Sequence, residues 1–597
     1  MIAPIRINQL SYTLDHDNIN AVYDIFTVET SMKYFKSGAY IIDAPVLEKN
    51  VKAVRFENGK RFYVLMNKNA ENRQRLRKAL SDVPFADTIT LRQVHSQSLD
   101  DYILLQLFLN SLCNVEHPLL RFNNLTGHLY CFHSEWLRKR DNIIWQVPCL
   151  ELCITSEYRL KFEVRTFTSE KLKSRITFVK RKFEDYPQYV LSVHNTLRRK
   201  LNGDKETAFI QRQIDGEKTG SIDFLRIDSI EGFETSKMGI VSNVLKQFNK
   251  QFANLAKIGF TEFSDYDCLD YDNNCKKEND ALIRSTLKKA KVRIVDGIRD
   301  DYSKEFCEKL QTLLIEKYKI SATIGKRITK GCLNLYLIHN SAYYQGINDP
   351  YKKSYSNTAV QHITFEDFVG KEKYALSTVI HELLIKSDLQ AGQIRLFDWP
   401  SLGFAENIAF GMRAKVGSNE RYFFMSICPN GSFIIKEQEL TLFEQAEYSD
   451  CVDVFEQAKQ DAKTIKGIIR DSHGNINSIM DSGLVTIPDI ALLQEELEGG
   501  NTALRGKEKR KELLNAVIDI RKFEKDSSIY YFVGAIGSGM KRTIHTAVNI
   551  RKIEPYRNAP NLFEQLLPLM SVTFVRNEQL TVVPFPFKYL KEYIRSL

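Results

Sequence analysis

The run Cys332-Leu-Asn-Leu-Tyr-Leu-Ile338 decides how the second half of this sequence is interpreted. It is apolar at nearly every position, which is typical of a parallel strand that is covered on both faces. Before it, Val292-Arg-Ile-Val295 has the composition of a strand, and residues 302–318 place their apolar side chains on one helical stripe. Residues 374–384 are also predicted to form a helix, with Lys386 at its C-terminal end. This alternation predicts a compact α/β module, which we place at residues 291–400.

Three short motifs in this module contain the candidate binding residues. They are Asn348-Asp-Pro-Tyr-Lys-Lys353, Ala359-Val-Gln-His-Ile-Thr364 and His381-Glu-Leu-Leu-Ile-Lys386. Gln361 and Lys386 are 25 positions apart, and Lys352 precedes Gln361 by nine. Lysine supplies a point charge and glutamine a neutral donor, so these side chains could converge on one small anion.

Three strand candidates and a helix follow the module. The strands are expected at residues 407–413, 421–427 and 432–435, and the helix at residues 450–465. Near the C-terminus lies the stretch Leu580-Thr-Val-Val-Pro-Phe-Pro-Phe-Lys-Tyr-Leu-Lys-Glu-Tyr593.

The N-terminal half reads as a mixed α+β region. Short apolar runs predict strands at residues 39–42, 54–56, 61–66, 150–164 and 176–179. Residues 100–110 have helical spacing, and the acidic, asparagine-rich residues 265–280 are expected to form an exposed connector.

Composition excludes several classes of protein. A chain of 597 residues is too long for one core, and 43% hydrophobic with 26% charged residues is typical of a soluble globular protein. The net charge of +10 suits a polyanionic partner. With no long apolar run and no signal-peptide pattern, we expect no membrane association and a cytoplasmic location, with the ten cysteines as reduced thiols.

The order of the motifs resembles that of prokaryotic Argonaute proteins, whose MID domain grips the 5′ end of a guide strand. The resemblance covers about residues 290–597. It implies an α/β multidomain fold, with a Rossmann-like MID domain, an RNase H-like PIWI domain and a mixed α+β N-terminal lobe. The implied domains are an N-like domain (1–110), a linker with a reduced PAZ-like region (111–205), a second linker (206–290), MID (291–400) and PIWI (401–597).

The resemblance also implies a guide pocket. Tyr351 or Tyr355 would stack on the first base, and Lys352 or Lys353 would reach the 5′-phosphate. The remaining pocket residues would be Gln361 and Lys386.

In many Argonaute proteins a metal ion at this pocket is held partly by the terminal carboxylate. The apolar last residue, Leu597, is compatible with a buried C-terminus that plays this part, and Mg²⁺ is the metal we would expect at the guide phosphate.

Nuclease activity in PIWI domains needs several acidic metal ligands. The first position is occupied here by Arg413 or Met412, and the second by Asp471. The candidates for the mobile glutamate are Glu444, Glu447 and Glu456, and the last position falls near Lys588 and Lys591. One matching acid cannot hold two metals, so we expect an inactive domain.

The implied function is that of an inactive, guide-binding Argonaute of the plasmid-defence type (DdmE-like). It would bind a short 5′-phosphorylated guide, with DNA favoured, pair it with complementary plasmid or phage DNA, and recruit a helicase–nuclease effector. Two alternatives remain open: an active guide-directed endonuclease whose acids are misassigned, and an unguided nucleic-acid-binding scaffold.

Overall fold

The structure is a computed structural model. It describes residues 4–32, 38–83, 85–114, 116–178, 181–192, 196–216, 222–270, 273–345, 348–353, 355, 357–438, 447–499, 519–526, 528–533, 543–544, 547–570 and 583–597. Two compact units divide the chain. The first comprises Met1–Ser264, Leu484–Asn515 and Ser538–Ala547, and the second Asp265–Gly483, Ala516–Gly537 and Val548–Leu597.

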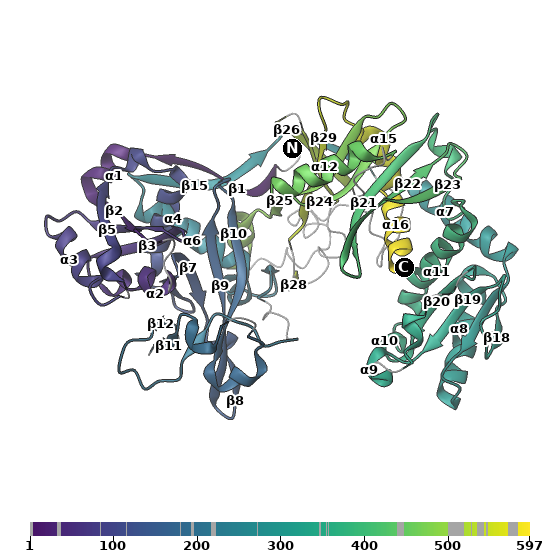
Figure 1. Cartoon of the computed structure of the whole chain (residues 1–597), viewed down its shortest axis with the longest axis horizontal. Coiled ribbons are helices and arrows are strands. Elements are labelled where there is room, and N and C mark those ends of the chain that lie inside the picture. Colours follow the sequence, from purple (N-terminus) through teal and green to yellow (C-terminus); the bar gives the residue numbers. More distant parts are fainter. Residues whose placement is uncertain are drawn as a thin grey trace. The chain divides into compact units, whose positions relative to one another are not determined.

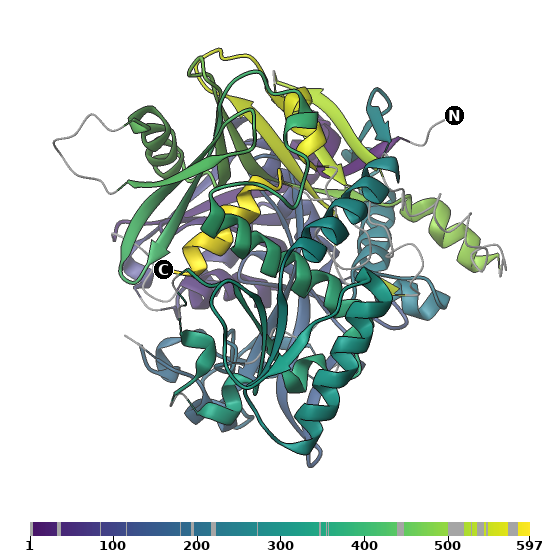
Figure 2. The same ribbon diagram turned by 90° about the vertical axis from the view of Figure 1, so that its right-hand side faces the viewer.

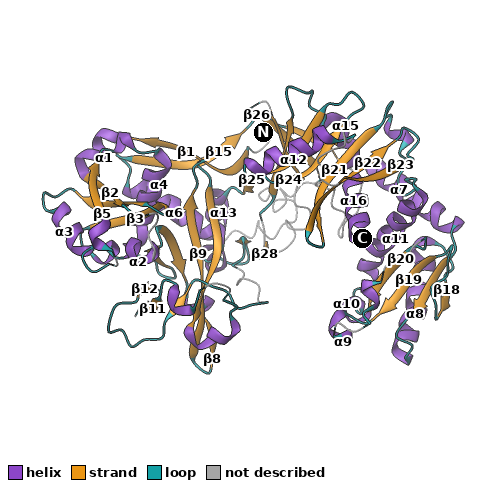
Figure 3. Ribbon diagram, in the orientation of Figure 1, coloured by secondary structure: helices purple, strands orange, loops and turns teal. Residues whose placement is uncertain are grey.

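The first unit contains two antiparallel sheets (Figures 1 and 3). One has the order β3-β4-β2-β5: Val51–Asn58, Arg61–Asn67, Tyr23–Thr30 and Ile89–Val94. The other has the order β12-β11-β13-β10-β9-β7-β6: Leu197–Arg199, Tyr189–Leu191, Phe209–Ile210, Leu160–Ser169, Ile143–Ile154, His128–Phe132 and Arg121–Leu125. The helices are α1 His16–Val22, α2 Gly38–Asp43, α3 Asn72–Ala79, α4 Asp101–Ser111, α5 Ile230–Glu234, α6 Lys237–Gln251 and α13 Ile490–Glu498. A further pair of strands, β1 Ile5–Leu14 and β15 Ala256–Phe263, is antiparallel.

Helix α4 joins the two sheets of this unit. Its side chains from Ile103 to Ser111 are buried. The side-chain amide of Asn110 donates to the backbone carbonyl of Val54 at 2.8 Å. The side-chain oxygen of Gln106 accepts from the backbone N–H of Ile154 at 2.5 Å. Buried amides need such partners, so these contacts fix the helix against β3 on one side and β9 on the other.

A parallel four-stranded sheet forms one part of the second unit. Its order is β18-β17-β19-β20: Thr323–Gly325, Val292–Asp296, Leu333–Ile338 and Val360–Thr364. Its helices are α7 Asn273–Lys289, α8 Asp301–Tyr318, α9 Ser341–Tyr344, α10 Phe365–Phe368 and α11 Glu372–Ala391. The predicted alternation of strands and helices is confirmed, and β20 is an edge strand.

The other part of the second unit is built on a sheet of order β16-β26-β27-β29-β25-β24-β21-β22-β23. These strands span Asp267–Asp270, Asp519–Lys525, Ser528–Val533, Asn549–Pro555, Ile476–Ile487, Ile465–Arg470, Ile408–Val416, Asn419–Ile427 and Phe433–Gln438. Helices α12 Ser449–Gln460 and α15 Phe563–Met570 belong to the same part. The three predicted strands and the helix after them are confirmed.

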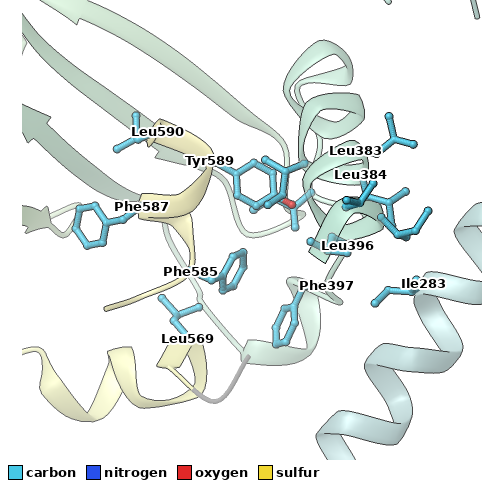
Figure 4. Close-up of a cluster of buried hydrophobic side chains, with 14 of the residues drawn as sticks. Ile283, Leu383, Leu384, Leu396, Phe397, Leu569, Phe585, Phe587, Tyr589 and Leu590 are labelled. Atoms are coloured by element: carbon cyan, nitrogen blue, oxygen red, sulfur yellow. The ribbon is translucent and has the colours of Figure 1, made fainter. Parts of the chain in front are cut away.

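Helix α16, Pro586–Arg595, connects the two parts of the second unit. Phe587 packs edge-on against Phe410 of β21, and the Tyr589 hydroxyl donates to Asp388 of α11 at 2.8 Å. Figure 4 shows Tyr589 facing helix α11, which carries Leu383 and Leu384, and Phe585 near Leu569 and Phe397 in the shared core. The chain ends directly after this helix (Figure 2).

Three predictions of secondary structure are wrong. Residues 39–42 belong to helix α2 and not to a strand. The prediction failed because a run of four apolar residues does not distinguish a helix from a strand. Residues 176–178 are not a strand, and Val179 lies outside the described residues. In place of a connector, residues 265–280 contain strand β16 and the start of α7.

In the part of the chain that the structure describes, no helix is both long and apolar enough to cross a bilayer. None of the described cysteines is in a disulfide.

Candidate nucleic-acid interface

Gln361 and Lys386 meet at the edge of the parallel sheet. Gln361 lies on β20 with 9% of its surface exposed, and its Nε2 donates to Oε2 of Glu382 at 2.8 Å. Lys386, one helical turn after Glu382 on α11, donates from Nζ to the Val360 carbonyl at 3.0 Å. The structure thus brings the two predicted residues together, and it adds a carboxylate between them.

Helix α16 completes this group with three charged side chains. Lys588 Nζ lies 3.4 Å from Oε1 of Glu382 and 3.5 Å from Oε1 of Glu592. A terminal nitrogen of Arg595 lies 2.6 Å from Glu592 Oε1. We call this set the α11–α16 cluster; it consists of Gln361, Glu382, Lys386, Lys588, Glu592 and Arg595.

Sequence reasoning missed Glu382, Glu592 and Arg595. Glu382 could have been found, because it precedes Lys386 by four residues on a predicted helix and therefore shares its face. The two residues of α16 could not, because they meet α11 only through the fold.

The cluster holds Lys386 in an environment that disfavours its charge. Burial lowers the pKa of Lys386, and the charges of Arg595 and Lys588 lower it further, while Glu592 and Glu382 oppose the shift. A partly desolvated ammonium beside other cations is stabilised by an added anion.

Aromatic side chains surround His362, the residue after Gln361. The rings of Tyr336, Tyr351 and Tyr355 lie 5.6, 5.3 and 5.9 Å from the His362 ring, centre to centre. Burial, and then the charge of Lys386, lower the pKa of His362 to about 4, so its ring is neutral at physiological pH. We call these four residues the His362 aromatic group. Tyr351 is 63% exposed and can offer its face to a base.

The remaining predicted pocket residues have mixed outcomes. Lys353 is exposed, whereas the side chain of Lys352 lies outside the described residues. Leu597 is 56% exposed, so the expectation of a buried terminal residue is wrong. Helix α16 ends at Arg595 and buries its apolar residues in earlier turns, so Leu597 lies beyond the residues that pack into the core.

The predicted catalytic positions lie far apart. Strands β21 and β24 pair antiparallel, with Ala409 opposite Arg470 and Gly411 opposite Ile468. Asp471 therefore falls beside the start of β21, about five residues or roughly 16 Å from Arg413 at ~3.3 Å per residue. Only a parallel pairing would place the end of β24 beside the later half of β21. The expectation that Arg413 and Asp471 share one emptied metal site is therefore wrong.

Asp471 has a local structural role. Its Oδ1 accepts from the backbone of His473 at 3.0 Å and of Asn475 at 2.8 Å, and its Oδ2 accepts from the Asn475 amide at 2.8 Å. The carboxylate thereby closes the turn between β24 and β25, as aspartates commonly do.

The other predicted positions differ in their surroundings. Arg413 is half-buried and lies opposite Tyr422 on β22, whose hydroxyl donates to Glu456. Glu447 is paired with Lys436. Lys591 is an exposed residue of α16, and Glu444 lies outside the described residues.

The donor set does not fit the expected Mg²⁺. The carboxylates nearest to Lys386 are Glu382 and Glu592, and both are paired with cations. Among the described residues, no three His, Cys, Asp or Glu side chains form a group suited to a metal ion. Mg²⁺ requires a near-octahedral set of oxygen ligands, and this cluster offers ammonium and guanidinium groups in their place.

A scan of the sequence against protein-family models finds no match, and neither does a search of curated protein sequences. Among solved structures, the Argonaute of Marinitoga piezophila in complex with a 5′-OH guide RNA is similar over 98% of this chain and 97% of that chain, with 9% identity and a TM-score of 0.42. The same protein with guide RNA and target DNA gives the same coverage and identity and a TM-score of 0.44. These values do not establish a family.

Proposed function

We propose that this chain binds a short guide strand by its 5′ end at the α11–α16 cluster, with the first base stacked on Tyr351. The observation that supports this most directly is the meeting of Gln361 and Lys386 at one sheet edge, where α16 adds Lys588 and Arg595. Lysine and arginine groups suit a phosphate, and stacking on tyrosine suits a strand of any sequence.

A bound anion would stabilise the charged form of Lys386 in this cluster. On guide entry, the Gln361 amide would exchange Glu382 for a phosphate oxygen, and Lys386 would regain a counter-charge. Because the donor set does not fit a metal, the proposal assigns neutralisation of the phosphate to the lysines and Arg595.

The guide would then pair with complementary nucleic acid, with DNA as the favoured guide and target. We propose that the chain does not cut the target, and that a separate helicase–nuclease acts on plasmid or phage DNA that it recognises. The positions predicted for two of the acidic ligands carry Arg413 and Lys591, and this loss of carboxylates supports the absence of cleavage.

The test compares binding of one oligonucleotide with a 5′-phosphate or a 5′-hydroxyl, by fluorescence anisotropy. The double variant Gln361→Ala/Lys386→Ala should weaken binding of the phosphorylated strand by about tenfold or more, since each charge-assisted hydrogen bond contributes about 1.5–3 kcal/mol. The matched control is Lys304→Ala, which removes an exposed lysine of α8.

Unchanged affinity of the double variant for both strands would contradict a 5′-end pocket and favour an unguided nucleic-acid-binding scaffold. Sequencing of nucleic acid that co-purifies with the chain would identify the guide. Short strands with uniform 5′ ends are expected.

A further inference from the structure

Three side chains in the first unit form a chain of close contacts that the proposed function does not use. Cys153 Sγ lies 3.4 Å from Nε2 of His128, and Nδ1 of His128 lies 2.8 Å from Oε1 of Glu151. The pairing of Leu129 with Leu152 places His128 opposite Cys153, and Glu151 is on the same face of β9 two residues earlier.

Glu151 is fixed by further partners. The Tyr130 hydroxyl donates to its Oε1 at 2.9 Å, and Arg165 Nε donates to its Oε2 at 2.6 Å. Burial would raise the pKa of Glu151, but the hydrogen bonds from His128 and Arg165 outweigh it and lower the pKa to about 2. The carboxylate is therefore charged, buried and held in one orientation.

His128 is correspondingly a cation at neutral pH. Burial alone would lower its pKa, but the hydrogen bonds to Cys153 and Glu151 outweigh it and raise the pKa to about 9. An imidazolium beside a sulfur favours the thiolate, which is the nucleophilic form of cysteine. The buried guanidinium of Arg55 adds positive charge near the same sulfur.

We propose that Cys153 is a nucleophilic thiol that small disulfides modify, with His128 as its proton partner and Glu151 as the residue that positions His128. The Cys153 thiolate attacks one sulfur of a low-molecular-weight disulfide, so that a new S–S bond forms and the old one breaks. The leaving thiolate takes the proton from Nε2 of His128. Cys153 is only half-buried, which admits a small electrophile.

The other described cysteines of the first unit differ in their surroundings. Burial raises the pKa of the Cys131 and Cys149 thiols well above the ordinary value, and it raises that of Cys113 to about 11. Apolar surroundings of this kind make a thiol inert. Cys153 is the described cysteine with a histidine in contact and a carboxylate behind it.

The test measures the rate at which oxidised glutathione, and separately iodoacetamide, modifies each cysteine of the full chain, resolved by mass spectrometry. Cys153 should react about tenfold or more faster than Cys332, a half-buried cysteine that serves as the internal control. His128→Gln should slow Cys153 by about tenfold without changing the rate at Cys332.

Rescue by a conservative variant separates a positioning role of Glu151 from a structural one. Glu151→Gln should slow Cys153 about as much as His128→Gln does, whereas Glu151→Asp, which keeps a carboxylate behind His128, should recover part of the rate. Equal rates at Cys153 and Cys332 in the unmodified chain, or a Cys153 rate that His128→Gln leaves unchanged, would overturn the proposal. These outcomes are independent of guide binding, because the contacts all lie within the first unit.

Discussion

At the scale of single residues, Glu382 is the side chain that most changes the interpretation of the pocket. Its Oε2 accepts the Gln361 amide and its Oε1 faces Lys588, so one carboxylate occupies the donors that a phosphate would need. A negative charge at this position opposes the binding of a phosphate dianion.

Glu382→Gln should therefore strengthen binding of a 5′-phosphorylated strand by about 5–10-fold, equivalent to about 1 kcal/mol, because it removes one repulsive charge near the surface. Anisotropy titrations with phosphorylated and hydroxyl strands would measure it. Glu308→Gln, on the exposed side of α8, is the control. Weaker binding of the phosphorylated strand would show that Glu382 does not face the ligand.

Glu151 has a large expected effect on stability. Glu151→Ala leaves Arg165, His128 and the Tyr130 hydroxyl without their acceptor, and loss of one partner of a buried ion pair costs about 3–5 kcal/mol. Glu163→Ala, which removes a half-exposed partner of Arg165, should cost about 0–1 kcal/mol. Denaturant unfolding of both variants checks the difference; equal costs would contradict it.

The ion pair between His128 and Glu151 predicts that the stability of the chain depends on pH. Because folding raises the pKa of His128 to about 9, its contribution to stability is complete below the unfolded value of 6.5 and is lost as the pH rises through about 9. The difference in unfolding free energy between the native chain and His128→Gln should shrink steadily from pH 6 to pH 10. A difference that stays constant across this range would rule out the ion pair as its source.

At the scale of elements, helix α16 has two functions on two faces. Its apolar face covers the antiparallel sheet through Phe587, and its polar face places Lys588 beside Glu382 of α11. Phe587 of α16 can lie close to β24 only because residue 467 is a glycine, since a Cβ at Gly467 would overlap the ring of Phe587.

Gly467→Ala should therefore push α16 away from the sheet and destabilise it by about 1–3 kcal/mol, the usual cost of overpacking. Hydrogen exchange in residues 586–595 would report the loss directly, and guide affinity should fall with it. The control is Gly259→Ala in β15, where the added Cβ would meet only Ser11 Oγ at 3.4 Å. Unchanged exchange in α16 would contradict the packing argument.

At the scale of the whole molecule, the direction of one strand sets the place of Asp471, the aspartate predicted as a metal ligand. An antiparallel β24 sends its terminal aspartate to the opposite end of β21 from Arg413, where it closes a turn. Two-metal hydrolysis needs its carboxylates at one point.

A chain loaded with a complementary guide should accordingly leave its target intact in the presence of Mg²⁺ or Mn²⁺, while it retains the target on a filter or gel. Binding of the duplex should weaken steeply with salt, because phosphate contacts release counterions. Denaturing electrophoresis provides the measurement. A product cut at one fixed position opposite the guide would contradict this and support the active-endonuclease alternative.

Local sequence patterns predicted the main elements of the parallel sheet in the second unit and their order. Apolar runs and helical stripes predict β17, α8, β19 and α11, and the strand–helix alternation predicts a parallel sheet, because these patterns depend on neighbouring residues. The meeting of Gln361 with Lys386 follows from the same local logic, since one strand and the helix after it supply both.

Contacts between distant parts of the chain could be seen only in the folded structure. Glu382 and Lys588 are 206 positions apart, and no local pattern predicts that α16 packs against α11. The direction of β24 and the contact between Cys153 and His128 arise from hydrogen bonds between strands, which any apolar strand can form in more than one register. Local periodicity sets which side chains a strand offers to each face, and long-range packing selects the strand that lies beside it.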